Sequence, residues 1–125
     1  LHQYGLAEPV FRQTDDILRL AALHNNRGIC YRETQEWGLA ESAYLASIRY
    51  WAQMNNPISL ANVQDGLGLV YLARGRYEEA RAIFEEALDN LHRRAGDPER
   101  DQLIAALRDH LARAEAVSAT VGGAV

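Results

Sequence analysis

The sequence contains no lysine, so all 13 of its basic residues are arginine, and it contains a single cysteine, Cys30. One cysteine can neither form an intrachain disulfide nor supply a thiolate cluster for zinc, so we expect a reducing compartment, the cytoplasm. No apolar run approaches the roughly 18 residues that a membrane span needs. The net charge of −4 argues against affinity for phosphate backbones, which requires clustered positive charge. We therefore expect no nucleic-acid partner and no membrane.

Side chains suited to catalysis or metal binding are also scarce. The histidines His2, His24, His92 and His110 are scattered, without carboxylates or thiols at ligand spacing. No activated nucleophile, paired-carboxylate constellation or phosphate-binding glycine loop is present. Cys30 is expected to be a buried, inert thiol. The sequence predicts a protein without enzymatic activity, metal or cofactor.

What the sequence does contain is a repeat with a period of 40 residues. Shifting the chain by this distance places small residues on small ones and large apolar residues on large apolar ones. The matched pairs include Gly28 with Gly68, Cys30 with Val70, Tyr31 with Tyr71, Trp37 with Tyr77, Ala40 with Ala80, Tyr44 with Phe84, and Ser47 with Ala87. A second shift superimposes Leu103, Leu107 and Leu111 on Val63, Leu67 and Tyr71. This self-similarity indicates stacked copies of one supersecondary unit.

The spacing of apolar residues within the repeat is helical, with the alternating steps of three and four of one buried face. Gly75 suits the left-handed turn that ends a helix, and Pro57 and Pro98 suit the first turn of the next. The predicted helices lie near 14–34, 36–54, 58–74, 76–94 and 98–117. No segment is predicted to form a strand.

The predicted organisation follows from these boundaries. Residues 1–13 are expected to form the tail of a preceding helix or a linker, 14–54 and 55–95 two repeat units, 96–118 a C-terminal capping helix, and 119–125 a disordered tail.

The residues of the repeat resemble the tetratricopeptide repeat, whose pattern is an aromatic residue, Leu-Gly, Tyr, and then Ala and Phe on a second helix. The second unit matches with Leu67, Gly68, Tyr71, Tyr77, Ala80, Phe84 and Ala87, and the first with Gly28, Tyr31, Ala40 and Tyr44. Gln64 replaces the leading aromatic residue. The long period is similar to that of kinesin light chains and of bacterial signal-transduction ATPases and transcriptional regulators. The resemblance implies an all-α fold, a right-handed α-α superhelix of antiparallel helix pairs.

In function, the resemblance implies a protein- or peptide-binding scaffold, a fragment of a larger bacterial regulatory or signalling protein. The first helix of each unit lines the concave groove of such arrays. The groove candidates are Asn25, Asn26, Arg32, Asn62, Asp65, Leu69 and Asp109, and Gln102 borders the groove in the same register. The family's basic clamp for C-terminal carboxylates is absent, because Ile29, Asp65 and Leu69 stand at its positions. The alternative interpretation is that the polar candidates are ordinary solvated residues.

A second hypothesis is self-association. The outer faces of the terminal helices could pair across a twofold axis and make the chain a homodimerisation module. A DNA-binding helix-turn-helix is disfavoured, because the repeat already explains Trp37 and Ala40 and no basic recognition helix follows.

Overall fold

The computed structural model describes residues 8–92 and 98–123. Within these ranges the chain forms five α-helices and no strand. The helices are α1 (Glu8–Glu33), α2 (Trp37–Ala52), α3 (Pro57–Ala73), α4 (Tyr77–His92) and α5 (Pro98–Gly123). The prediction of an all-α helical repeat is confirmed.

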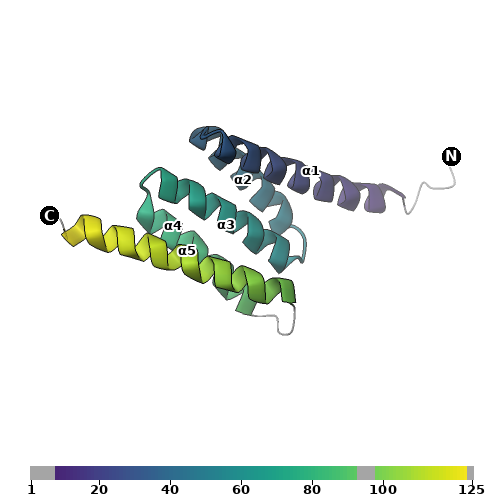
Figure 1. Cartoon of the computed structure of the whole chain (residues 1–125). Coiled ribbons are helices and arrows are strands. Elements are labelled where there is room, and N and C mark those ends of the chain that lie inside the picture. The colour runs from purple at the N-terminus through teal and green to yellow at the C-terminus, as the bar shows by residue number, and fades with distance from the viewer. Residues whose placement is uncertain (1–7, 93–97, 124–125) are drawn as a thin grey trace.

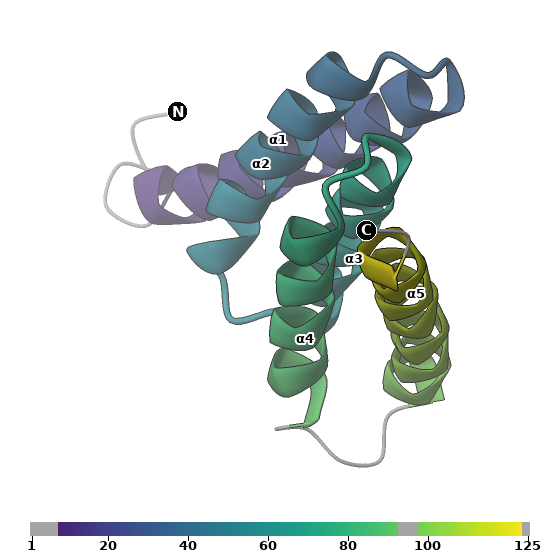
Figure 2. The same cartoon turned by 90° about the vertical axis from the view of Figure 1, so that its left-hand side faces the viewer.

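The helices form two antiparallel pairs, α1 with α2 and α3 with α4, and α5 packs on the second pair. In Figure 1 the helices α1, α3 and α5 lie one below another on the side facing the viewer, with α2 and α4 behind them. The quarter turn to Figure 2 shows α4 beside both α3 and α5. The chain therefore has two layers, one made by the first helix of each unit and one by the second.

Both helix pairs are closed by the same turn. Gln35 has a φ of 61° and Gly75 a φ of 74°, so each turn contains one residue in the left-handed region. In both turns the next backbone N–H donates to a carbonyl five residues earlier, at 2.8 Å. This is the closure that commonly ends a helix with a left-handed residue. The turn at Gly75 was predicted; that at Gln35 was not, because a residue with a Cβ rarely adopts positive φ.

In each unit an aromatic ring of the second helix packs directly on a glycine of the first. A Cβ added at Gly28 would lie 2.7 Å from Cδ1 of Tyr44, and one added at Gly68 would overlap the ring of Phe84. Tyr44 also reaches the next unit, because a Cβ at Gly66 would lie 2.7 Å from its Cζ. The repeat pattern thus records a packing contact, and Tyr44 makes that contact with two units at once.

The core consists of two clusters of buried side chains. One joins α2 to α3 and contains Ala40, Tyr44, Val63, Leu67 and Val70. The other joins α3, α4 and α5 and contains Ala61, Ala80, Phe84, Ala87, Leu88, Leu91, Ile104, Leu107 and Ala114. Tyr31 and Tyr71 are partly buried against these clusters, and Tyr77 is also partly buried. Because each cluster takes side chains from neighbouring parts of the repeat, each unit depends on its neighbour for burial.

At one pair of equivalent positions the two units make different kinds of contact. In the first unit the rings of His24 and Tyr50 stack in parallel, 5.7 Å apart and inclined by 7°. Forty residues later Gln64 is buried, with 2 % of its surface exposed, and its Oε1 accepts a hydrogen bond of 3.4 Å from Nδ2 of Asn90. An amide pair therefore takes the place of a ring stack. The residue that departs from the family pattern has a partner in the structure.

An arginine links the two units on the side of these turns. Arg76, after the turn between α3 and α4, donates to Glu41 of α2 and, through Nε at 2.7 Å, to Glu79 of α4. Its guanidinium also lies 4.6 Å from the centre of the Tyr71 ring. The hydrogen bond from Arg76 is the main reason that the pKa of Glu79 lies below its ordinary value.

The start of the first helix differs from the prediction. Helix α1 begins at Glu8 instead of near Thr14, so residues 8–13 continue into the first unit. Pro9 is tolerated there because N–H groups in the first turn of a helix have no acceptor within the helix, so the missing N–H of proline costs no hydrogen bond. Residues 1–7 lie outside the described part of the chain.

The C-terminal boundary differs as well. Helix α5 continues to Gly123, so most of the segment expected to be a disordered tail, 119–125, is helical. Extending an existing helix avoids the cost of nucleation, which lets two glycines be included. Residues 124–125 are not described.

The predicted helix starts at the prolines are confirmed. Pro57 and Pro98 are the first residues of α3 and α5. The Oδ1 atom of Asn56 caps α3 by accepting a 3.2 Å hydrogen bond from the N–H of Ser59.

The prediction for Cys30 is wrong, because its side chain is exposed. Its repeat partner Val70 is completely buried, since α2 covers that face of α3. Within the described residues nothing covers the equivalent face of α1, where Leu23 is 42 % exposed and Arg27 stands in place of Leu67.

Candidate binding groove

The face made by the first helices is hollowed between α3 and α5. The hollow has a volume of about 490 Å³. Its lining comes from two helices: Ile58, Ser59, Asn62 and Asp65 of α3, and Glu99, Gln102, Leu103 and Ala106 of α5. Below, these eight residues define the α3–α5 hollow. Three of these residues are apolar and five are polar or charged, so the hollow offers both apolar contact and hydrogen-bonding groups.

Three residues predicted from the sequence meet in this hollow. Asn62 and Asp65 line it from α3, and Gln102 lines it from α5. Asn62 and Gln102 are exposed, whereas Asp65 is partly buried. The hollow therefore has one amide side chain on each side, Asn62 on α3 and Gln102 on α5, and a carboxylate on α3.

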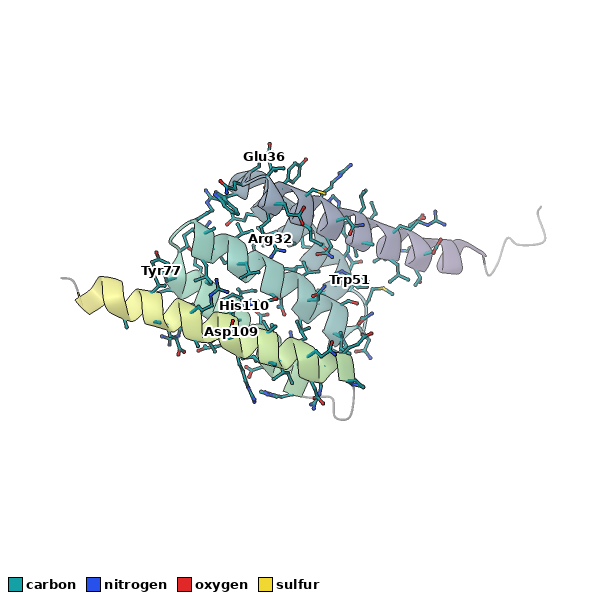
Figure 3. All side chains as sticks on the ribbon, viewed as in Figure 1. Arg32, Glu36, Trp51, Tyr77, Asp109 and His110 are labelled. Atoms are coloured by element: carbon teal, nitrogen blue, oxygen red, sulfur yellow. The ribbon has the colours of Figure 1, made fainter. Side chains whose placement is uncertain are left out.

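The other candidates on α3 and α5 lie elsewhere. Leu69 is partly buried and packs against the cluster that joins α3, α4 and α5, so it contributes to the stacking of the units. Asp109 is exposed on α5 and is absent from the lining of the α3–α5 hollow; Figure 3 labels it beside His110.

The three candidates on α1 do not reach the α3–α5 hollow. Asn25 and Arg32 are partly buried and Asn26 is exposed. Arg32 is close enough to Tyr44 to affect its ionisation. Burial raises the pKa of Tyr44 and the positive charge of Arg32 lowers it, while the negative charge of Asp65 raises it further. Arg32 of α1 and Asp65 of α3 therefore act on the same phenol from different units.

An ion-pair geometry connects α3 and α5 beside the hollow. Nδ1 of His110 lies 2.6 Å from Oδ1 of Asp65, and the two side chains are only 17 % and 14 % exposed. A carboxylate accepts hydrogen bonds, so the imidazole donates from Nδ1. The His110 ring also rests against Phe84, with the ring centres 5.8 Å apart. Asp65 is thus held by a mostly buried residue of α5 that contacts Phe84 of the core.

The sequence did not identify His110 as part of this site. In the repeat register it falls on Val70, a core position, and a histidine at such a position requires a polar partner. The need for a polar partner was therefore the feature of the sequence that could have indicated a contact of His110. The remaining lining residues were not among the candidates, because the register does not show where along a face the two helices separate. They are Ile58, Ser59, Glu99, Leu103 and Ala106.

Neither a metal centre nor a membrane span is found in the described part of the chain. No three His, Cys, Asp or Glu side chains gather as metal ligands among residues 8–92 and 98–123. Over the same ranges, none of the helices is long and apolar enough to cross a bilayer.

Stacked antiparallel helix pairs, a repeated glycine–aromatic contact and a hollow on the layer of first helices define a helical-repeat protein. A family model described as the tetratricopeptide repeat matches residues 18–91 and 59–116. The chain belongs to this family, whose repeats generally mediate protein–protein interaction. Searches of curated proteins and of solved structures gave no match.

Proposed function

We propose that the chain is a non-enzymatic scaffold that binds an extended peptide segment of another protein in the α3–α5 hollow. The observation that carries this proposal is the hollow itself, which opens on the layer of first helices and has an amide side chain on each side. Asn62 and Gln102 can each donate to and accept from a peptide backbone. Ile58 and Leu103 provide apolar contact for a side chain of the ligand.

The proposed site is small. One hollow between two helices contacts only a few ligand residues, so we expect a modest, reversible affinity. Such an affinity suits a module that acts together with other domains. On the resemblance of its repeat alone, we further propose that the parent is a cytoplasmic bacterial regulatory or signalling protein.

The test is selection of binders from a library of random linear peptides, followed by titration against two variants. Ala106→Leu adds bulk inside the hollow and should weaken binding of the selected peptides by about tenfold. Ala82→Leu adds the same bulk at an exposed position of α4 and should leave binding unchanged. Equal binding to both variants would refute the assignment of the groove.

Self-association remains a second proposal, supported by the uncovered face of α1. Leu20 and Leu23 are 36 % and 42 % exposed, and the repeat partner of Leu23, Val63, is 1 % exposed beneath α2. Pairing of two such faces would bury them. Sedimentation velocity over a range of concentrations tests it: dimers that dissociate on Leu23→Glu support this proposal, and a monomer at every concentration contradicts it.

A further inference from the structure

The chemistry of the α3–α5 hollow indicates which ligand side chain it accepts. Two of its lining residues, Asp65 and Glu99, carry carboxylates. Among the residues that the structure describes, no arginine or histidine lines it. The same lining includes the apolar side chains of Leu103 and Ala106.

Asp65 is held in a fixed position. His110 engages its Oδ1 at 2.6 Å, and only 14 % of the Asp65 side chain is exposed. The contact with His110 engages Oδ1, and the second oxygen of the carboxylate can accept a hydrogen bond from a ligand. The carboxylate is therefore immobile and partly withdrawn from water, which strengthens a hydrogen bond from a ligand to it.

The three classes of ligand side chain differ sharply in such a site. An acidic side chain would be repelled by the carboxylate of Asp65. An apolar side chain would remove water from Asp65 without donating a hydrogen bond in its place, which is costly for a polar group. A basic side chain can lay its aliphatic stem along the apolar wall and bring its charged end to the carboxylate.

We propose that the α3–α5 hollow binds a lysine or arginine side chain of an extended segment in a partner protein, with Asp65 as the principal counter-charge. This inference rests on the proposed function of the groove. The partner segment is then basic and complements the acidic hollow. The net charge of the chain, −4, favours the same kind of partner.

The experiment uses the full chain and peptides from the random library, measured by fluorescence anisotropy. The selected peptides are expected to share one basic position. Replacing that residue by norleucine keeps the stem and removes the charge, and should weaken binding about tenfold or more. Because this change is made in the peptide, the result does not depend on the stability of a protein variant.

Two protein variants complete the test. Asp65→Asn keeps the shape of the side chain and should abolish the advantage of the basic peptide over its norleucine analogue. Asp109→Asn removes an exposed carboxylate of α5 outside the lining and should preserve that advantage. Raising the salt concentration should weaken the binding of the basic peptide more than the binding of its norleucine analogue.

The outcomes separate this inference from the function on which it rests. One outcome is that the binding of the selected peptides is weakened by Ala106→Leu and yet they share an acidic or apolar position instead of a basic one. That result would overturn the inference and leave the groove assignment intact. The same holds if Asp65→Asn retains the full preference for the basic peptide. If no selected peptide is weakened by Ala106→Leu, both the groove assignment and the inference fail.

Discussion

The ring of Tyr44 lies in the space that a side chain at Gly66 would occupy: an added Cβ would stand 2.7 Å from Cζ of the ring. Tyr44 belongs to the first unit and Gly66 to the second. The relative position of the units, and with it the spacing of the helices that carry the binding face, thus depends on a residue with no side chain.

Substitution of this glycine therefore tests the stacking of the units. Gly66→Ala should lower the free energy of unfolding by about 2 kcal/mol, because the ring is buried and has little room to move. Gly38→Ala is the matched control, since nothing lies within 4 Å of a Cβ there, and should raise stability by about 0.5 kcal/mol. Urea denaturation measures both. A Gly66→Ala protein as stable as the control would contradict this packing.

The hydroxyl of Tyr44 has a separate effect. Among the described residues it is a buried oxygen without a hydrogen-bond partner, and the equivalent residue of the second unit is Phe84. Tyr44→Phe should therefore raise the free energy of unfolding by about 1 kcal/mol. The reverse change, Phe84→Tyr, should lower it by a similar or larger amount. Destabilisation by Tyr44→Phe would show that the hydroxyl is satisfied in solution.

The same burial predicts a loss of stability at alkaline pH. Burial raises the pKa of Tyr44 above its ordinary value of 10.0, so the unfolded state ionises first. The stability that folding gains from keeping Tyr44 neutral is fully present below pH 10.0, the pKa of the unfolded state. This stability is lost as the pH rises through the higher pKa of the folded state. The chain has no lysine, a residue type that would otherwise titrate in the same range.

Thermal denaturation at increasing pH measures this effect. The unmodified chain should lose stability above pH 10.0 more steeply than Tyr44→Phe. The decline that remains in the variant includes Tyr71, whose pKa is also raised, chiefly by burial. Parallel declines in the two proteins would exclude Tyr44 as a source.

The two turns provide a prediction about the backbone. Gln35 adopts a φ of 61°, which a residue with a Cβ reaches at a cost, whereas Gly75 adopts a φ of 74° freely. Gln35→Gly should raise stability by about 0.5 kcal/mol, and Gly75→Ala should lower it by about 1 kcal/mol. Denaturant midpoints of the two variants should move in opposite directions. Movement in the same direction would show that other contacts of Gln35 determine its effect.

The fold could be predicted because the sequence contains the same packing pattern twice. Gly28 with Tyr44 and Gly68 with Phe84 recur at the same spacing and make the same contact. The pattern does not show whether a further helix covers the outer face of the first unit. Cys30 was assigned the burial of Val70, yet the helix that would cover it is absent from the described residues.

The site was only partly predictable for a related reason. Asn62, Asp65 and Gln102 followed from the register, which fixes the face of a helix on which a residue lies. The register does not show where along that face the helices separate. Nor could it show that His110, at a core position, turns toward Asp65, because the partner lies 45 residues away on another helix.

The most direct test of the central claim is NMR chemical-shift mapping of the backbone and side-chain amides, with a selected basic peptide added to the full chain. We predict the largest changes at the amide groups of Asn62 and Gln102, which line the α3–α5 hollow from opposite sides. The exposed face of α4, including Ala82, should change little. Largest changes on α4, or on the uncovered face of α1 at Leu20 and Leu23, would contradict a binding groove on the layer of first helices.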